Sequence, residues 1–124
     1  MTRRGVALLD APMAREVLLW GLPPELENSA RAEAQRTGLA VVALPGAGGD
    51  VKPPGLAVVG AVPGTAELVV GLKGRSGWSA LPVLAVMMGL EPSLVAPLRA
   101  AGVVRIMMQD EFLMELPTIL RAVA

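Results

Sequence analysis

The sequence contains no histidine, no cysteine and no tyrosine. Without cysteine the chain can form no disulfide, iron–sulfur site or thiol nucleophile. Without histidine it lacks the side chain that most often performs acid–base catalysis and binds zinc. Carboxylates, hydroxyls and basic groups are what remain for chemistry. We therefore expect a protein that is not an enzyme and that needs no metal and no cofactor.

The chain also lacks a net charge and a long apolar run. Its 11 basic residues balance its 11 acidic ones, so charge gives no reason to expect nucleic acid as a partner. The longest uncharged stretch, residues 76–90, is interrupted by Gly77, Pro82 and Gly89 and falls short of the roughly 20 apolar residues of a membrane span. We expect a cytoplasmic protein without a membrane span, whose apolar residues, 53% of the total, are buried.

At 124 residues the chain has the length of one domain. Its apolar residues form short continuous runs bounded by glycine or proline, a pattern typical of strands buried on both faces. These runs are residues 17–20, 39–44, 56–59, 82–88 and 103–108. Helical segments are predicted between them, over residues 25–37, 65–73 with Thr65 as N-cap, 92–101 and about 113–123, where Pro117 limits the start.

Strands that alternate with helices predict right-handed βαβ units and a parallel sheet covered on both faces. Residues 45–54 are the exception, because their glycines and prolines exclude a helix. The predicted fold is therefore α/β, a small doubly wound five-stranded parallel sheet whose second helix is replaced by a loop. The loop itself, a second copy of the chain or another domain is expected to cover the sheet face that the missing helix leaves open.

Three short motifs point to chemistry only weakly. The glycines of residues 46–49 follow a strand but lack the spacing of a dinucleotide loop. Residues 60–65 lack the lysine of a phosphate-binding loop. Asp110 and Glu111 stand where a helix begins, so we interpret them as an N-cap and a first-turn charge in preference to metal ligands.

The order and spacing of the segments over residues 15–124 resemble the receiver domain of bacterial response regulators, with residues 1–14 as an N-terminal extension. The matching segments read VLLWGLPP (17–24), GLAVVGAVP (55–63), WSALPVLAVMM (78–88) and AAGVVRIMMQD (100–110). The resemblance rests on the register of the whole chain. It implies a receiver/flavodoxin-like fold and a place in two-component signal transduction.

Position by position, the resemblance puts residues without the family's chemistry at the family's functional positions. The acidic pair that holds Mg²⁺ corresponds to Gly21 and Leu22, and the phosphoacceptor aspartate to Gly60. The hydroxyl and lysine that contact the phosphoryl group correspond to Met87 and Gln109. Phosphoryl transfer needs a nucleophile, a metal and a cation, which these residues do not supply. The resemblance therefore implies a pseudo-receiver that acts independently of phosphorylation.

The resemblance also implies where such a domain meets its partners. In the family, the face formed by the fourth helix, fifth strand and fifth helix carries dimerisation or partner docking. On this chain that face would include Arg99, Arg105, Ile106, Glu115 and Arg121, with Ile106 at the position of the family's switching aromatic residue. We expect a protein partner or a homodimer, or contacts with further domains of a longer chain.

Apolar residues at the ends of the predicted strands leave one alternative open. They would cluster at the carboxyl edge of the sheet, where ligands of doubly wound folds bind. They are Trp20, Leu22, Met87, Met88, Met107 and Met108. Methionine fills irregular gaps in a core, but it also lines adaptable binding sites. The alternative function is thus small-molecule or nucleotide sensing through a methionine-lined pocket or the glycine loop at 46–49.

Overall fold

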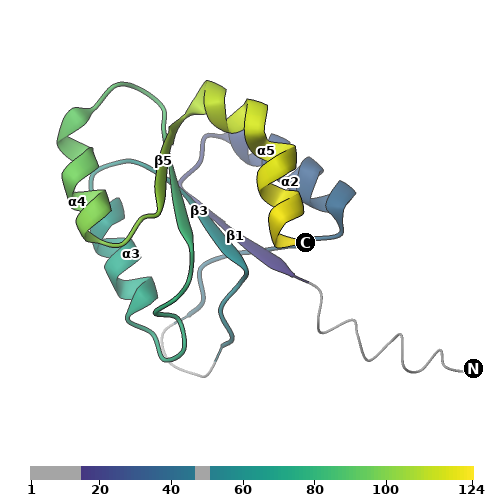
Figure 1. Ribbon diagram of the computed structural model, residues 1–124, viewed down its shortest axis with the longest axis horizontal. Helices are drawn as coiled ribbons and strands as arrows, with labels where there is room; N and C mark the ends of the chain where they lie inside the picture. Colours follow the sequence, from purple (N-terminus) through teal and green to yellow (C-terminus); the bar gives the residue numbers. More distant parts are fainter. Residues whose placement is uncertain (1–14, 47–50) are drawn as a thin grey trace, which may run out of the picture.

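The computed structural model describes residues 15–46 and 51–124, and it contains a five-stranded parallel sheet with the order β2-β1-β3-β4-β5 (Figure 1). The strands are β1 (Glu16–Trp20), β2 (Ala40–Val42), β3 (Leu56–Gly60), β4 (Val83–Met87) and β5 (Arg105–Met108). The helices are α2 (Pro24–Thr37), α3 (Thr65–Lys73), α4 (Val95–Ala100), preceded by the short 3-10 helix η2 (Pro92–Leu94), and α5 (Gln109–Val123). This order confirms the predicted doubly wound fold.

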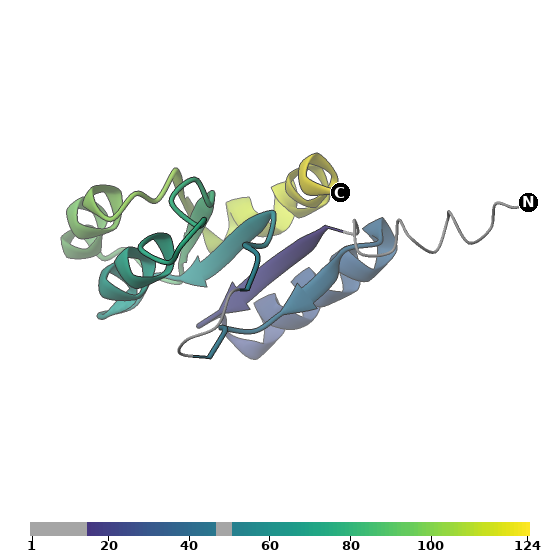
Figure 2. The same cartoon turned by 90° about the horizontal axis from the view of Figure 1, so that it is seen from below.

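Helices cover both faces of the sheet (Figures 1 and 2). α2 and α5 lie against the face that includes Val58 and Val86, while α3 and α4 lie against the face that includes Val59 and Ala85. Successive residues of a strand point to opposite faces, so each strand contributes to both cores. This double burial explains why the strands appear in the sequence as continuous apolar runs.

The last helix begins earlier than predicted. α5 starts at Gln109, not at about residue 113, and it contains Pro117 in its interior. Phe112, Leu116 and Leu120 are spaced to lie on one side of the helix, and all three are buried. Burial of this stripe outweighs the hydrogen bond that proline removes. The acidic pair is in the first turn as predicted, but the N-cap is Met108.

The turn between β3 and α3 also differs from the prediction. Gly64, with φ 96°, is the N-cap of α3, so Thr65 is its first residue. The Thr65 hydroxyl donates a hydrogen bond to the Gly60 carbonyl oxygen at 2.7 Å and accepts one from the Val62 amide at 3.0 Å. Thr65 is fully buried, so its side chain fixes this turn to the end of β3.

The connection from β2 to β3 contains no helix in its described residues, 43–46 and 51–55, as predicted. Trp78, from the α3–β4 connection, is buried in the core on the face of α3 and α4, and it donates a hydrogen bond from its Nε1 to the Val51 carbonyl oxygen at 2.7 Å. Arg75 lies over the Trp78 ring, 5.1 Å from its centre, and donates to the Gly46 carbonyl oxygen at 3.3 Å. The buried indole therefore ties the connection from β2 to β3 to the core on the face of α3 and α4.

Two further predictions concern the N-terminal extension and the absence of a membrane span. The predicted N-terminal extension, residues 1–14, lies outside the described residues. Among the helices of residues 15–46 and 51–124, none has the length and apolar character required to cross a membrane.

Candidate functional site

The predicted site residues lie along one edge of the sheet, where the parallel strands end. Gly60 is the last residue of β3 and Met87 the last of β4. Gly21 and Leu22 follow β1 directly, and Gln109 follows β5 as the first residue of α5. We call this the carboxyl edge. It is the place where doubly wound sheets bind their ligands, so it is the candidate site.

The backbone of Gly21 closes the space next to Gly60. A Cβ atom on Gly60 would overlap the carbonyl oxygen of Gly21 and lie 2.8 Å from its carbonyl carbon. The same atom would lie 3.2 Å from Cε of Met88. Gly21 has φ 72°, in the left-handed region that glycine adopts without strain. Position 60 therefore accepts a hydrogen atom but no side chain unless the backbone moves.

The other predicted positions provide no charge at the strand ends. Leu22 and Met87 are buried, and they belong to the cores on opposite faces of the sheet. Gln109 is exposed and lines a cavity of about 220 Å³ between α2 and α5. A phosphoryl group beside Leu22 and Met87 would lose its hydration without gaining a counter-charge. Within the described ranges there is also no group of three or more acidic side chains that could hold a metal ion.

The apolar residues at the strand ends do not form the single cluster that the sequence predicted. Leu22, Met88 and Met107 pack in the core under α2 and α5, whereas Trp20 and Met87 pack in the opposite core. Side chains alternate along a strand, so neighbouring methionines are directed to different faces. Three cavities of about 530, 290 and 220 Å³ lie between described residues, and none of the three is lined by methionine. These contacts favour the interpretation of Met87, Met88 and Met107 as core residues, whereas Met108 is exposed. The glycine loop at 46–49 lies mostly outside the described residues.

Comparison with known proteins bears on the fold. No protein-family model and no curated protein matches the sequence. Solved structures do match, including the chemotaxis response regulator CheY4 of Vibrio cholerae, with a TM-score of 0.70 and 15% identity over 90% of this chain and 99% of that chain. A signal receiver domain of a two-component histidine kinase from Clostridium thermocellum matches with a TM-score of 0.70 and 14% identity over 88% of this chain and 96% of that chain. The phosphorylated cyanobacterial phytochrome response regulator RcpA matches with a TM-score of 0.67 and 12% identity over 89% and 91%.

This chain has the receiver fold. The likeness confirms the fold implied by the resemblance in sequence order. At these identities the likeness concerns the fold, so the chemistry has to be derived from the residues of this chain.

One face of the receiver fold, formed by α4, β5 and α5, carries a charge network centred on Arg105. The two Nη atoms of Arg105 donate to the two carboxylate oxygens of Glu115, each at 2.9 Å, and Nη2 also donates to Glu111 at 2.9 Å. Hydrogen bonds with Glu115 and then Glu111 raise the pKa of Arg105, so this side chain stays charged at physiological pH. Arg99 and Arg121 form no ion pair with any carboxylate of the described residues.

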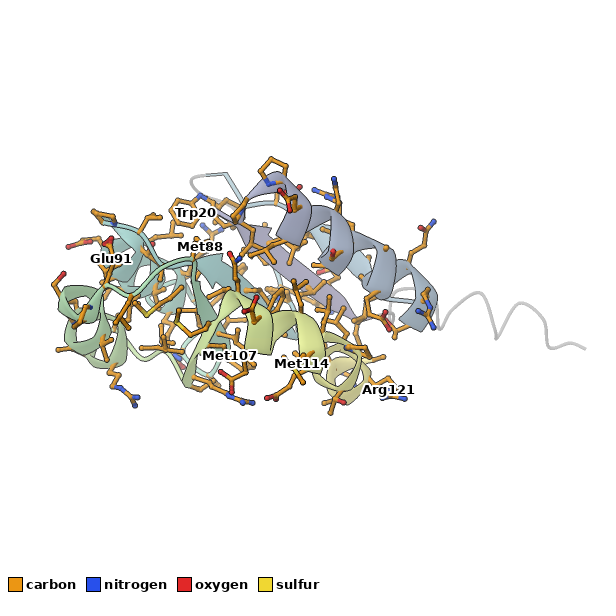
Figure 3. The ribbon with its side chains drawn as sticks, turned by 90° about the horizontal axis from the view of Figure 1, so that it is seen from above. Trp20, Met88, Glu91, Met107, Met114 and Arg121 are labelled. Carbon is orange, nitrogen blue, oxygen red and sulfur yellow. The ribbon has the colours of Figure 1, made fainter. Side chains whose placement is uncertain are left out.

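Exposed apolar side chains accompany this network. Val104 and Met108, from β5 and the turn before it, are exposed, and Met114 on α5 is 82% exposed (Figure 3). Ile106 is half-buried and packs against the core under α3 and α4. Sequence reasoning singled out the charges of this face and Ile106, and it missed Met114. The spacing of the buried residues of α5 was the signal that would have placed Met114 on the opposite side of that helix.

Proposed function

We propose that this chain is a signalling domain of the receiver type that acts without phosphorylation, as a protein-binding module and not as an enzyme. The observation that carries the proposal is the closed space at Gly60. By the resemblance in register, Gly60 stands where a receiver has its phosphoacceptor. A carboxylate there would have to displace the backbone of Gly21, which is packed against the end of a central strand.

The carboxylates that remain at the carboxyl edge support the same proposal. Glu25 lies in the first turn of α2, and Asp110 and Glu111 lie in the first turn of α5. Glu111 is hydrogen-bonded to Arg105, which draws it toward the α4–β5–α5 face. A carboxylate becomes an effective phosphoryl acceptor only with a metal and a cation placed around it. The buried apolar residues Leu22 and Met87 supply neither.

The first test is chemical. We expect incubation with acetyl phosphate and Mg²⁺ to leave the intact mass of the protein unchanged, because no nucleophile stands at the end of β3. Intact-mass spectrometry measures the result, and a receiver domain that has the acceptor aspartate, treated in the same way, shows that the reagent is active. A phosphate added to this chain and mapped to a residue of the carboxyl edge contradicts the proposal.

The α4–β5–α5 face supports the binding part of the proposal. It combines exposed apolar side chains with Arg105, which forms ion pairs with two carboxylates, those of Glu111 and Glu115. Protein interfaces are enriched in methionine and arginine and depleted of lysine. The occupant that we propose for this face is a protein partner or a second copy of the chain.

The second test uses two valines of similar exposure on different faces. Val104 is 65% exposed on the α4–β5–α5 face, and Val70 is 58% exposed on α3. We expect Val104→Asp to weaken association about tenfold or more, since a charge would be buried in an apolar contact, and Val70→Asp to leave it unchanged. Sedimentation equilibrium measures self-association, and photo-crosslinking from position 104 or position 70 in the source cells detects a partner. A monomer that crosslinks equally from both positions would contradict this assignment.

A further inference from the structure

The charges of this chain are separated along the strand direction. The helices begin at the carboxyl edge and end at the opposite edge (Figure 1). Their first turns carry Glu25, Glu27, Glu67, Asp110 and Glu111, and their last turns carry Arg36, Lys73, Arg99 and Arg121. This placement suits the helix dipoles, which favour negative charge at the N-terminus and positive charge at the C-terminus. Although it has no net charge, the protein is therefore negative at its carboxyl edge.

Apolar side chains occupy the centre of the same edge. Trp20 ends β1 and is half-buried, and Val62 follows β3 and is exposed. Met88 follows β4 and is half-buried, and Leu90, two residues later, is 82% exposed. In Figure 3 the labels of Trp20 and Met88 lie next to each other, and that of Glu91 lies toward α4. We call Trp20, Val62, Met88 and Leu90 the apolar strip.

Four of the carboxylates at the carboxyl edge form no ion pair within the described residues. Glu27 is paired with Arg31, and Glu111 with Arg105. Glu25, Glu67, Glu91 and Asp110 form no ion pair within residues 15–46 and 51–124. The carboxylates alone would define no site. Together with a half-buried tryptophan and an exposed leucine, they define the chemistry that would complement this edge.

We propose that the carboxyl edge binds a peptide segment of a partner protein in which apolar anchor residues are flanked by lysine or arginine. Trp20, Met88 and Leu90 offer the apolar area that dominates binding energy in interfaces. The surrounding carboxylates select a basic segment and repel an acidic one. This surface is separate from the α4–β5–α5 face and goes beyond the proposed function, because it would bind even if that face bound nothing.

The experiment uses a synthetic helical peptide of leucine and lysine as the probe. Trp20 reports its binding, because Trp78, the other of the two tryptophans, is 1% exposed. We expect the peptide to protect Trp20 from acrylamide quenching, with an affinity that falls as salt is added. We expect two comparison peptides, one with glutamate in place of lysine and one with serine in place of leucine, to bind with an affinity lower by about tenfold or more. Equal binding of either comparison peptide overturns the proposal.

Two exposed apolar residues give a matched pair of variants. Leu90 in the apolar strip and Met114 on α5 are both 82% exposed, so neither substitution by serine should affect folding. We expect Leu90→Ser to weaken binding about fivefold and Met114→Ser to leave it unchanged. Glu67→Gln and Glu91→Gln together should reduce both the affinity and its salt dependence.

Other outcomes assign the surface differently. If Leu90→Ser and Met114→Ser behave alike, the peptide does not bind at the apolar strip and the proposal fails. If the chain alone self-associates in sedimentation and Leu90→Ser abolishes this, the edge binds the basic edge of a second copy, which also overturns the proposal. Val104→Asp should not change peptide binding, so a failure here is distinguishable from a failure of the proposed function.

Discussion

Gly60→Ala is expected to destabilise the protein by about 3 kcal/mol, a large effect for a single added methyl group. The new Cβ would overlap the backbone of Gly21, and a backbone cannot rotate away as a side chain can. β3 is paired with β1 on one side and with β4 on the other, so it cannot shift without breaking one of the two ladders. Urea denaturation followed by circular dichroism measures the change.

Gly71→Ala is the control for this experiment. Gly71 lies in α3, where an added Cβ meets no atom within 4 Å. Alanine has the higher helix propensity, so this variant is expected to be more stable by about 0.5–1 kcal/mol. If Gly60→Ala instead folds with the stability of the unsubstituted chain, the space at the end of β3 is open. The main support for phosphorylation-independent action would then be lost.

Most of the fold could be predicted from the sequence because its signals are local. The third strand was predicted over residues 56–59 and is Leu56–Gly60, and α3, predicted over residues 65–73 with Thr65 as N-cap, is Thr65–Lys73 with Gly64 as N-cap. In both segments a glycine or proline marks the end of an apolar or helical run. The start of α5 could not be predicted, because it depends on the burial of Phe112 against residues of other elements.

The candidate site was predictable in its residue types but not in its geometry. The register alone identified Gly21 and Gly60 as positions without a reactive side chain. Their contact depends on the pairing of β1 with β3 and on the positive φ of Gly21, which no local pattern reveals. The predicted methionine cluster was wrong for a related reason. It grouped residues at the carboxyl ends of neighbouring strands, whereas Met87 and Met88 are directed to opposite cores.

Trp78→Ala is the second substitution from which we expect a large effect, a destabilisation of about 3–5 kcal/mol. Trp78 is among the largest fully buried side chains, and it packs in the core that also holds Leu18 on the face where the second helix is missing. Its removal would leave a cavity in this core. It would also release the Val51 carbonyl from its hydrogen bond with the indole.

Two further variants separate the contributions of Trp78. Trp78→Phe keeps most of the ring but loses the hydrogen bond to Val51, so its additional cost beyond the lost volume is about 1 kcal/mol. Arg75→Ala removes the cation over the ring and the contact with Gly46, both near the surface, and should cost about 1 kcal/mol or less. Thermal and urea unfolding measure all three. A Trp78→Ala variant as stable as Arg75→Ala would mean that the buried indole contributes little to the stability of this core. We expect the loss of stability to decrease in the order Trp78→Ala, Trp78→Phe and Arg75→Ala. This order is expected if the buried indole, and not the cation near the surface, stabilises the face of the sheet that lacks the second helix.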